Sequence, residues 1–177
     1  MEIEAKLEAL GLVLPPPIQA PLGVRLPFAA VRVLGRRAFI SGHSAQNPDG
    51  SVAGPFGKVD ETVLESGPIA GKWGDMTALV SVEDGYNAAR LTALSMLASL
   101  KRELGDLDRV TAWLRVFGMV NSAPGFALQP KVINGFSDLI IELYGPIRGA
   151  HARSAVGMAE LPFHIPVEIE AEVEIDG

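Results

Sequence analysis

The sequence predicts an α+β fold in which one mixed sheet carries two helices on the same face. Strand-like and helix-like segments follow in the order β-β-α-β-α-β-β, and each helix-like segment connects strands that can lie parallel in one sheet. The last strand alternates apolar and acidic residues without a slip, which indicates a sheet with one covered face. The chain has 177 residues, an ordinary length for one domain with a substantial core. We therefore expect a single domain over residues 1–177.

The composition argues against several classes of site and partner. The chain has no cysteine and only three histidines, without the spacing of a zinc site, so thiolate chemistry, disulfides and metal ligation have no support. The net charge is −6 and no basic cluster is longer than two residues, which makes nucleic acid a poor partner. The N-terminus does not resemble a secretory signal, and no apolar run suits a membrane span. We expect a soluble, cytoplasmic protein with no metal or other cofactor.

Two N-terminal features precede the core of the predicted domain. Residues 2–10 have Ile3, Leu7 and Leu10 at helical spacing and predict a short amphipathic helix. The proline-rich segment 14–23 excludes helix and central strand, so an extended surface strap is expected. We take residues 1–25 together as this helix and strap.

The first half of the predicted domain holds a hairpin, a long loop and a helix. Residues 29–34 and 37–43 read as strands joined by a turn at Gly35 and Arg36. Residues 47–76 are rich in glycine, proline and charge and predict a long inserted loop, a feature that is usually functional or flexible. The segment 80–108 is the strongest helix pattern, with Ser81 as a plausible cap and Gly105 as a natural stop.

The second half contains three strands and one helix. Residues 109–122 predict a strand covered on both faces, and 131–145 predict a shorter helix that ends at Gly145 and Pro146. The segments 153–161 and 166–175 read as strands joined by a turn at 162–165, which predicts a simple hairpin.

The two last strands present unusual faces. In 167–175 the acids Glu168, Glu170, Glu172 and Glu174 point away from the apolar residues. For the last three a solvated face that discourages aggregation is the simplest interpretation, whereas Glu168 differs because it lies at the start of the strand beside the turn. On the strand from Arg153, that arginine shares a face with alanines and a glycine. Apart from the arginine, this face carries only small side chains, which leaves room for a helix to pack closely or for a second subunit. Two helices cannot cover the whole sheet, so oligomerisation is expected.

Several segments together resemble one family. The block HARSAVGMAELPFHIPVEIEAEVEI (151–175) is similar to the C-terminal signature of the RidA/YjgF family of reactive-intermediate imine deaminases, also called the endoribonuclease L-PSP family. FISGHSAQNPDG (39–50) resembles the family's Ser-Gly turn after the first hairpin. GDLDRVTAWLRVFGMVNSAPGF (105–126) and VINGFSDL (132–139) resemble its central strand and the asparagine of its second helix. The resemblance covers most of the chain from about Leu26, and the extra segments indicate a longer, divergent branch.

The resemblance implies a fold, an assembly and an activity. Members have a chorismate-mutase-like fold, are homotrimers and have clefts between subunits. The best-known members hydrolyse 2-aminoacrylate and related 2-imino acids to 2-keto acids and ammonia. By resemblance, Arg153 binds the substrate carboxylate and Glu168 positions the attacking water. Ser41, Gly42, Asn134 and Phe28 match further cleft positions.

The chemistry of these residue types agrees with that role. An imine carbon is already electrophilic, so its hydrolysis needs orientation and a directed water, and no metal. A guanidinium such as that of Arg153 is a permanently charged fork that matches a carboxylate, and a carboxylate such as Glu168 can serve as base. His151 follows a glycine-containing loop and either lines the same cleft or is an ordinary loop residue. Ser41 suits a hydrogen-bond donor better than a nucleophile, and His43 and His164 are interpreted as loop residues.

Geometry adds a constraint on the proposed pair. In a simple hairpin about 162–165, Glu168 lies opposite Ala159, six positions from Arg153, or roughly 20 Å at about 3.3 Å per residue. One small substrate cannot contact both. The two side chains therefore cooperate only if they come from different chains.

Two alternatives to an imine deaminase stay open. Phe28 stands where the deaminases commonly carry tyrosine, and Ala155 where they often carry cysteine. These departures favour a non-catalytic trimer that binds or senses a small carboxylate. The third reading is the endoribonuclease activity attached to the family's names, against which the negative charge and the lack of a paired-histidine motif count.

Overall fold

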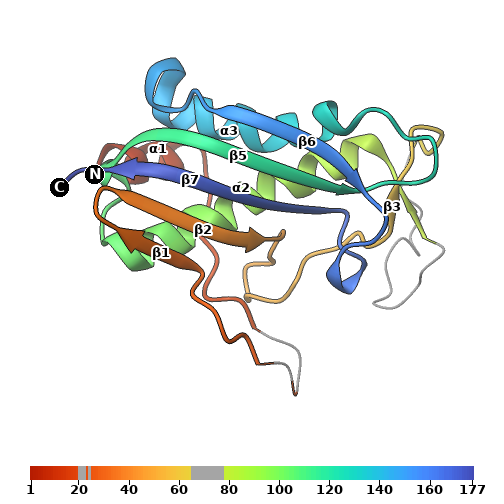
Figure 1. Ribbon diagram of the computed structural model, residues 1–177, viewed down its shortest axis with the longest axis horizontal. Coiled ribbons are helices and arrows are strands. Elements are labelled where there is room, and N and C mark those ends of the chain that lie inside the picture. Colours follow the sequence, from red (N-terminus) through yellow and green to blue (C-terminus); the bar gives the residue numbers. More distant parts are fainter. Residues whose placement is uncertain (20–22, 24, 65–77) are drawn as a thin grey trace.

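The computed structural model describes residues 1–19, 23, 25–64 and 78–177. Its main feature is a five-stranded mixed sheet with strand order β1-β2-β7-β5-β6. Two long helices, α2 (Val82–Leu104) and α3 (Gln129–Arg148), lie side by side on one face (Figure 1). The predicted order of elements and the placement of both helices on one face are confirmed. The strands are β1 (Val31–Leu34), β2 (Arg37–His43), β5 (Val110–Asn121), β6 (Ala152–Met158) and β7 (Val167–Ile175).

The predicted hairpin of the last two strands is wrong. Strand β5 lies between β6 and β7, pairing parallel with β6 and antiparallel with β7. The turn at 162–165 exists, but it contains a short 3-10 helix, η2 (Pro162–His164), and returns the chain one strand further away. A parallel neighbour requires a crossover, and α3 supplies it between β5 and β6. Local turn signals cannot distinguish this route from a hairpin.

Helix α2 begins and ends where its sequence indicates. The Ser81 hydroxyl accepts a hydrogen bond from the Asp84 N–H at 3.1 Å, and Gly105 ends the helix in the left-handed region with φ 79°. The helix is therefore shorter than the predicted 80–108. Helix α3 begins earlier than predicted, with Pro130 in its first turn, and is broken at Gly145, where φ is 76°.

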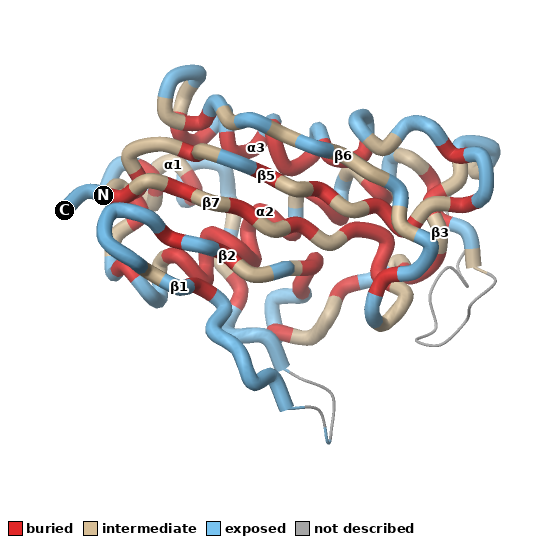
Figure 2. The backbone as a smooth tube through the Cα atoms, in the orientation of Figure 1, coloured by how far each residue is buried: buried red, intermediate tan, exposed pale blue. Residues whose placement is uncertain are grey.

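The core lies between the sheet and the two helices. In β7 the apolar residues are buried and the four glutamates are half-buried, a strict alternation that Figure 2 shows along the strand. The predicted acidic face is thus confirmed. The face of β6 with the small side chains is directed toward α3. Ala155 packs against the core, and a Cβ on Gly157 would lie 2.9 Å from Gln129 Nε2. Of the two expectations for that face, close helix packing is the one observed.

The N-terminal segment packs on its own chain. Helix α1 (Glu2–Ala9) buries Ile3 and Leu7, and Lys6 Nζ donates a 2.8 Å hydrogen bond to the Leu143 carbonyl at α3. The proline-rich strap runs extended past α2, although residues 20–22 and 24 lie outside the described part. None of the described helices is both long and apolar enough to cross a membrane.

The segment predicted as the loop 47–76 contains a short strand. Residues Lys58–Val59 (β3) pair parallel with Leu79–Val80 (β4) in a separate two-stranded ladder. A further bridge joins Val59 to Ser122, which ties the segment to the end of β5. Residues 65–76 of the predicted loop lie outside the described residues. Another short 3-10 helix, η1 (Leu107–Arg109), leads into β5.

Candidate functional site

Arg153 is held in place by neutral acceptors. Its Nη1 donates to Asn134 Oδ1 at 3.0 Å and to Ser137 Oγ at 2.9 Å, and its Nη2 donates to the Pro130 carbonyl at 3.5 Å. All three acceptors lie on α3, which packs against the edge strand that carries Arg153. Among the described residues no carboxylate pairs with this guanidinium, so its charge is oriented without being neutralised. Such a group is suited to bind an anion.

His151 belongs to the same cluster, and its protonation follows from its partners. Its Nδ1 lies 2.7 Å from the Gly149 carbonyl, which can only accept, so Nδ1 carries the proton. Its Nε2 lies 2.9 Å from Ser137 Oγ and therefore accepts from that hydroxyl. Burial lowers the pKa of His151, and the nearby charge of Arg153 lowers it further. The ring is thus a neutral support that orients Ser137 beneath Arg153.

Glu168 lies at a bulge in the neighbouring pair of strands. Ile40 pairs with Ala171 and His43 with Ile169, so Ser41 and Gly42 stand opposite the single residue Glu170. The bulge brings the Glu168 carboxylate against Gly42, where a Cβ would be 2.0 Å from Glu168 Oε1. Bulges of this kind re-aim side chains and often occur next to active sites. Only glycine leaves room for the carboxylate here.

The Glu168 carboxylate is free to act on a ligand. It has no hydrogen bond or ion pair among the described residues, and its pKa is raised by burial and, to a lesser degree, by the charge of Glu170. A raised pKa brings the carboxyl group closer to the operating range of a general base at neutral pH.

The predicted site residues fall into two groups within one chain. Arg153, Asn134 and His151 gather at α3 and β6, whereas Gly42, Glu168 and Phe28 gather beyond β7. Val116 of β5 pairs with Arg153 on one side and with Ala171 on the other, so Arg153 and Ala171 are level in the sheet. Glu168 lies three residues from Ala171 along β7, which places the backbones of Arg153 and Glu168 about 14 Å apart. Arg153 also faces the helices, while Glu168 belongs to the opposite face of the sheet. The correction to the hairpin shortens the separation but leaves the two side chains unable to contact one small molecule.

Ser41 and Phe28 border two different hollows. Ser41 Oγ donates a 2.8 Å hydrogen bond to the Ala29 carbonyl, which holds the segment before β1 against β2. Ser41 also borders a hollow of about 250 Å³ on the helix-free face, together with Arg32, Arg115 and Glu170. Phe28 is 59% exposed and lines a larger cavity beside Gly42 and Glu168. The hydroxyl of Ser41 thus has a structural partner.

His43 is not the loop residue that the sequence suggested. It ends β2 beside the bulge, where its Nδ1 donates to the Ser41 carbonyl at 2.7 Å and its Nε2 accepts from Ser99 Oγ at 2.8 Å. Ser99 Oγ in turn accepts from Arg102 Nη2 at 2.9 Å. Burial lowers the pKa of His43, so the ring is neutral. The ring braces the bulge that places Gly42 against Glu168.

Sequence reasoning also missed Ser137. This serine links Arg153 to His151, and it lies three residues after Asn134 on α3, so both side chains lie on the same face of the helix. That spacing was a usable signal for Ser137. No sequence signal pointed to the contact between His43 and Ser99, because 56 residues separate them.

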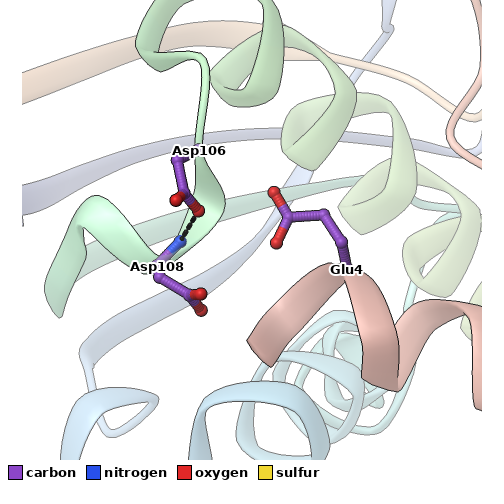
Figure 3. Close-up of side chains that lie close together, drawn as sticks. All are labelled: Glu4, Asp106 and Asp108. Atoms are coloured by element: carbon purple, nitrogen blue, oxygen red, sulfur yellow. Dashed lines mark hydrogen bonds between the residues drawn. The ribbon is translucent and has the colours of Figure 1, made fainter. Parts of the chain in front are cut away.

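An acidic group elsewhere in the fold has a structural explanation. Glu4, Asp106 and Asp108 approach one another where α1 meets η1 (Figure 3). Asp108 caps α1 by accepting from the Ile3 N–H at 3.0 Å and the Glu2 N–H at 2.5 Å, and Glu4 accepts from Lys101 Nζ at 2.6 Å. Asp106 caps η1 through the Asp108 N–H. These carboxylates serve helix ends and an ion pair.

Known proteins resemble this chain over most of its length. The family model described as “YjgF/chorismate mutase-like, putative endoribonuclease” matches residues 54–165. Protein TCP17 of Trypanosoma cruzi is 37% identical over 155 residues, covering 88% of this chain and 90% of that protein.

Two solved structures extend the comparison. The Agrobacterium tumefaciens protein Atu1372, of unknown function, has a TM-score of 0.76 and 33% identity, covering 99% of this chain and 93% of the other. Escherichia coli TdcF with bound serine has a TM-score of 0.54 and 16% identity, covering 91% of this chain and 99% of the other, and shows the fold alone.

Proposed function

The chain belongs to the RidA/YjgF family, and we propose that it hydrolyses 2-imino acids of the 2-aminoacrylate type to 2-keto acids and ammonia. The observation that carries the proposal is the unneutralised guanidinium of Arg153, held by Asn134 and Ser137 at an edge of the sheet. The serine bound to Escherichia coli TdcF supports a ligand with an amino-acid-like carboxylate.

The proposed reaction needs two protein groups. Arg153 holds the substrate carboxylate through paired N–H donors, which fixes the imine carbon. Glu168 accepts a proton from a water molecule, whose oxygen attacks that carbon. Collapse of the resulting carbinolamine expels the nitrogen as ammonia after protonation, and the carbonyl of the 2-keto acid forms. Water is the sole co-substrate, and no oxidation or reduction takes place.

The geometry supports a site shared between two subunits. Within one chain Arg153 and Glu168 lie on opposite faces of the sheet, with their backbones about 14 Å apart. A second copy that brings its Gly42 and Glu168 to the first copy's Arg153 removes this separation. We therefore propose a homotrimer with the cleft at each interface, as the family resemblance implied.

A non-catalytic binding trimer is the second candidate. Phe28 and Ala155 supply neither the hydroxyl nor the thiol that family resemblance leads one to expect there, and Ala155 is packed against the core. Such a protein retains the carboxylate contact of Arg153 and lacks turnover. An endoribonuclease function has less support, because the chain carries a net charge of −6.

An imine-trapping assay tests the proposed activity. We generate 2-aminoacrylate or 2-iminobutanoate in situ, trap the surviving imine with semicarbazide, and compare wild type with Arg153→Ala. We expect wild type to deplete the imine and the variant to lose at least about 100-fold in kcat/KM, because two charge-assisted hydrogen bonds to the carboxylate disappear.

The matched control removes a different arginine. Arg90→Ala deletes an ion pair with Glu142 at 3.1 Å on the outer surface of the helices, so we expect full activity. Imine loss no faster than in buffer would contradict the deaminase and leave the binding trimer. RNA cleavage that persists in Arg153→Ala and Glu168→Ala would contradict both the site and the function.

A further inference from the structure

A cavity of about 450 Å³ opens beside Gly42 and Glu168. This volume equals that of about 15 water molecules in the liquid. It is far larger than the methyl side chain of a three-carbon imino acid requires. It lies within the range of small-molecule sites. Its walls come from residues 17–18 of the proline-rich strap, the segment before β1, the loop after β2, α2 and η2. The large apolar side chains that line it are those of Ile18, Leu26, Phe28, Val52, Phe163 and Ile165.

Several polar side chains around the cavity already have hydrogen-bond partners in side chains or backbone carbonyls of the same chain. His43 and Ser99 share a hydrogen bond of 2.8 Å, and Arg102 donates to Ser99 Oγ at 2.9 Å and to the Pro15 carbonyl at 3.1 Å. Gln46 Nε2 donates to the carbonyls of Pro16 and Gly50, each at 3.3 Å. These contacts leave an apolar surface toward the space between the walls.

Glu168 is the exception among the ionisable side chains of the described lining. Of the ionisable side chains in the described lining, it is the one without a hydrogen bond or ion pair. A molecule that fills the cavity therefore has its reactive, polar end at Glu168 and an apolar body directed toward Phe28 and Phe163.

Backbone conformation and hydrogen bonds set the position of two parts of the wall. Phe163 and His164 are held in the left-handed region with φ 58° and 56°, a conformation that costs free energy for residues other than glycine and persists only when the surroundings require it. It places the Phe163 ring at the cavity. The bonds from Arg102 and Gln46 hold Pro15 and Pro16 of the strap, and Ile18 of the same strap also lines the cavity.

We infer that this cavity receives the side chain of the substrate, so the chain acts on 2-imino acids with bulky apolar side chains in preference to the three-carbon acid. The inference rests on the proposed function and names its substrate class. The imines derived from leucine and phenylalanine carry such side chains, and the imines derived from alanine and serine do not.

Competing imines test this preference. An amino-acid oxidase generates the imine of leucine or of alanine, and semicarbazide traps what the protein does not hydrolyse. Each buried methylene is worth about fourfold in binding, so three additional carbons predict up to about 60-fold in kcat/KM. We expect at least tenfold in favour of the leucine imine. Calorimetry with the two products, 4-methyl-2-oxopentanoate and pyruvate, gives a readout that does not depend on turnover.

A matched pair of variants ties the preference to the cavity. Ile18 lines the cavity and is 42% exposed, so Ile18→Trp fills the cavity with a larger side chain. Ile147 lies outside the cavity and is 89% exposed, so Ile147→Trp makes the same change where no cavity is filled. We expect Ile18→Trp to lose tenfold on the leucine imine but little on the alanine imine, and Ile147→Trp to match wild type. If neither imine is hydrolysed and neither keto acid binds, the proposed function fails.

Two other outcomes overturn the inference while the deaminase stands. One is hydrolysis of the alanine imine at least as fast as that of the leucine imine. The other is a preference for leucine that Ile18→Trp leaves unchanged, which would assign the side chain to another surface.

Discussion

In two places in this chain, a serine hydroxyl forms hydrogen bonds with both an arginine and a histidine. Each guanidinium donates to a serine oxygen, the serine donates to a histidine Nε2, and the histidine Nδ1 donates to a backbone carbonyl. The two chains of bonds are Arg102–Ser99–His43–Ser41 and Arg153–Ser137–His151–Gly149. In each case a neutral histidine fixes the serine that orients a charge. The first set braces the bulge at Gly42, and the second holds Arg153.

This arrangement predicts that acid weakens the fold. Burial lowers the folded-state pKa of His43 from 6.5, and that of His151 is lowered from the same value. As the pH falls through about 6.5, the unfolded chain takes up protons that the folded chain does not, so the free energy of unfolding decreases. The loss ends once the pH is below the folded-state pKa values. Denaturant titrations at pH 7.5 and 5.5 measure it.

His43→Gln separates this histidine from other titrating groups. The amide can replace one of the ring's hydrogen bonds but cannot be protonated, so part of the decrease between pH 7.5 and 5.5 should disappear. The remaining part belongs to His151, whereas Glu168, whose pKa is raised by burial, changes the free energy of unfolding in the opposite direction. A wild-type protein that gains stability on acidification over this range would contradict the neutral state of both rings.

Gly42→Ala tests the contact between the bulge and Glu168. The new Cβ would lie 2.0 Å from Glu168 Oε1, the far end of a flexible side chain, so the carboxylate moves while the fold adapts. We expect a loss of at least tenfold in imine hydrolysis and a change in unfolding free energy of about 1 kcal/mol or less. Kinetics and denaturant unfolding on the same sample measure both.

Gly35→Ala is the opposite case. Gly35 has φ 59° in the turn between β1 and β2 and no atom within 4 Å of its hypothetical Cβ. It should cost about 1–2 kcal/mol of stability through backbone strain and leave kcat/KM unchanged. Equal activity losses in both glycine variants would mean that the effect at Gly42 is not local to Glu168.

The two helices meet at a point where a side chain cannot fit. A Cβ on Gly135 of α3 would lie 2.0 Å from the Tyr86 carbonyl oxygen of α2, and a backbone oxygen cannot move aside cheaply. Helix propensity alone predicts that Gly135→Ala stabilises α3 by about 1 kcal/mol. We expect the overlap to dominate and to lower the unfolding free energy by about 3 kcal/mol. Denaturant unfolding decides the sign.

Lys131→Ala is the control on the same helix. Lys131 is exposed, so its replacement should change the free energy of unfolding by no more than about 0.5 kcal/mol. A neutral or stabilising Gly135→Ala would show that α2 and α3 are free to separate.

At the level of elements, sequence patterns predicted which segments form helices and strands better than they predicted which strands lie next to each other. The alternation in 167–175, the cap at Ser81 and the stop at Gly105 each depend on a few neighbouring residues, and the structure confirms them. The insertion of β5 between β6 and β7 depends on which long-range pairing buries the most apolar surface, and no local pattern encodes that. The contact of His43 with Ser99 was missed for the same reason.

The site follows the same division. Arg153 and Glu168 stood out by residue type and resemblance, and the structure shows that neither has an ion pair among the described residues. Ile18 and Phe163 did not stand out, because an apolar residue in a loop carries no signal of its own. Their shared position becomes visible only in the structure, where both line one cavity beside Gly42 and Glu168.

At the level of the whole molecule, none of the described helices covers the face of the sheet that lies away from α2 and α3 (Figure 1). Phe39 is 37% exposed there, and Phe117 and Val156 are half-buried. Exposed apolar sheet surface of this kind favours association. Light scattering in solution should give three times the 18.7 kDa mass of the chain. Phe117→Glu places a charge on this face and should shift the protein toward the monomer and abolish imine hydrolysis.

Mixing two inactive variants tests whether the site spans subunits. Arg153→Ala and Glu168→Ala should each be inactive alone, because every interface lacks one of the two groups. After co-refolding in equal amounts, an interface whose arginine comes from one variant and whose glutamate comes from the other is complete, so random assortment predicts about one quarter of wild-type activity. Two copies of the same variant refolded together serve as the control. Because a site within one chain gives no recovery in the mixture, inactivity of correctly assembled mixed trimers would contradict the shared cleft.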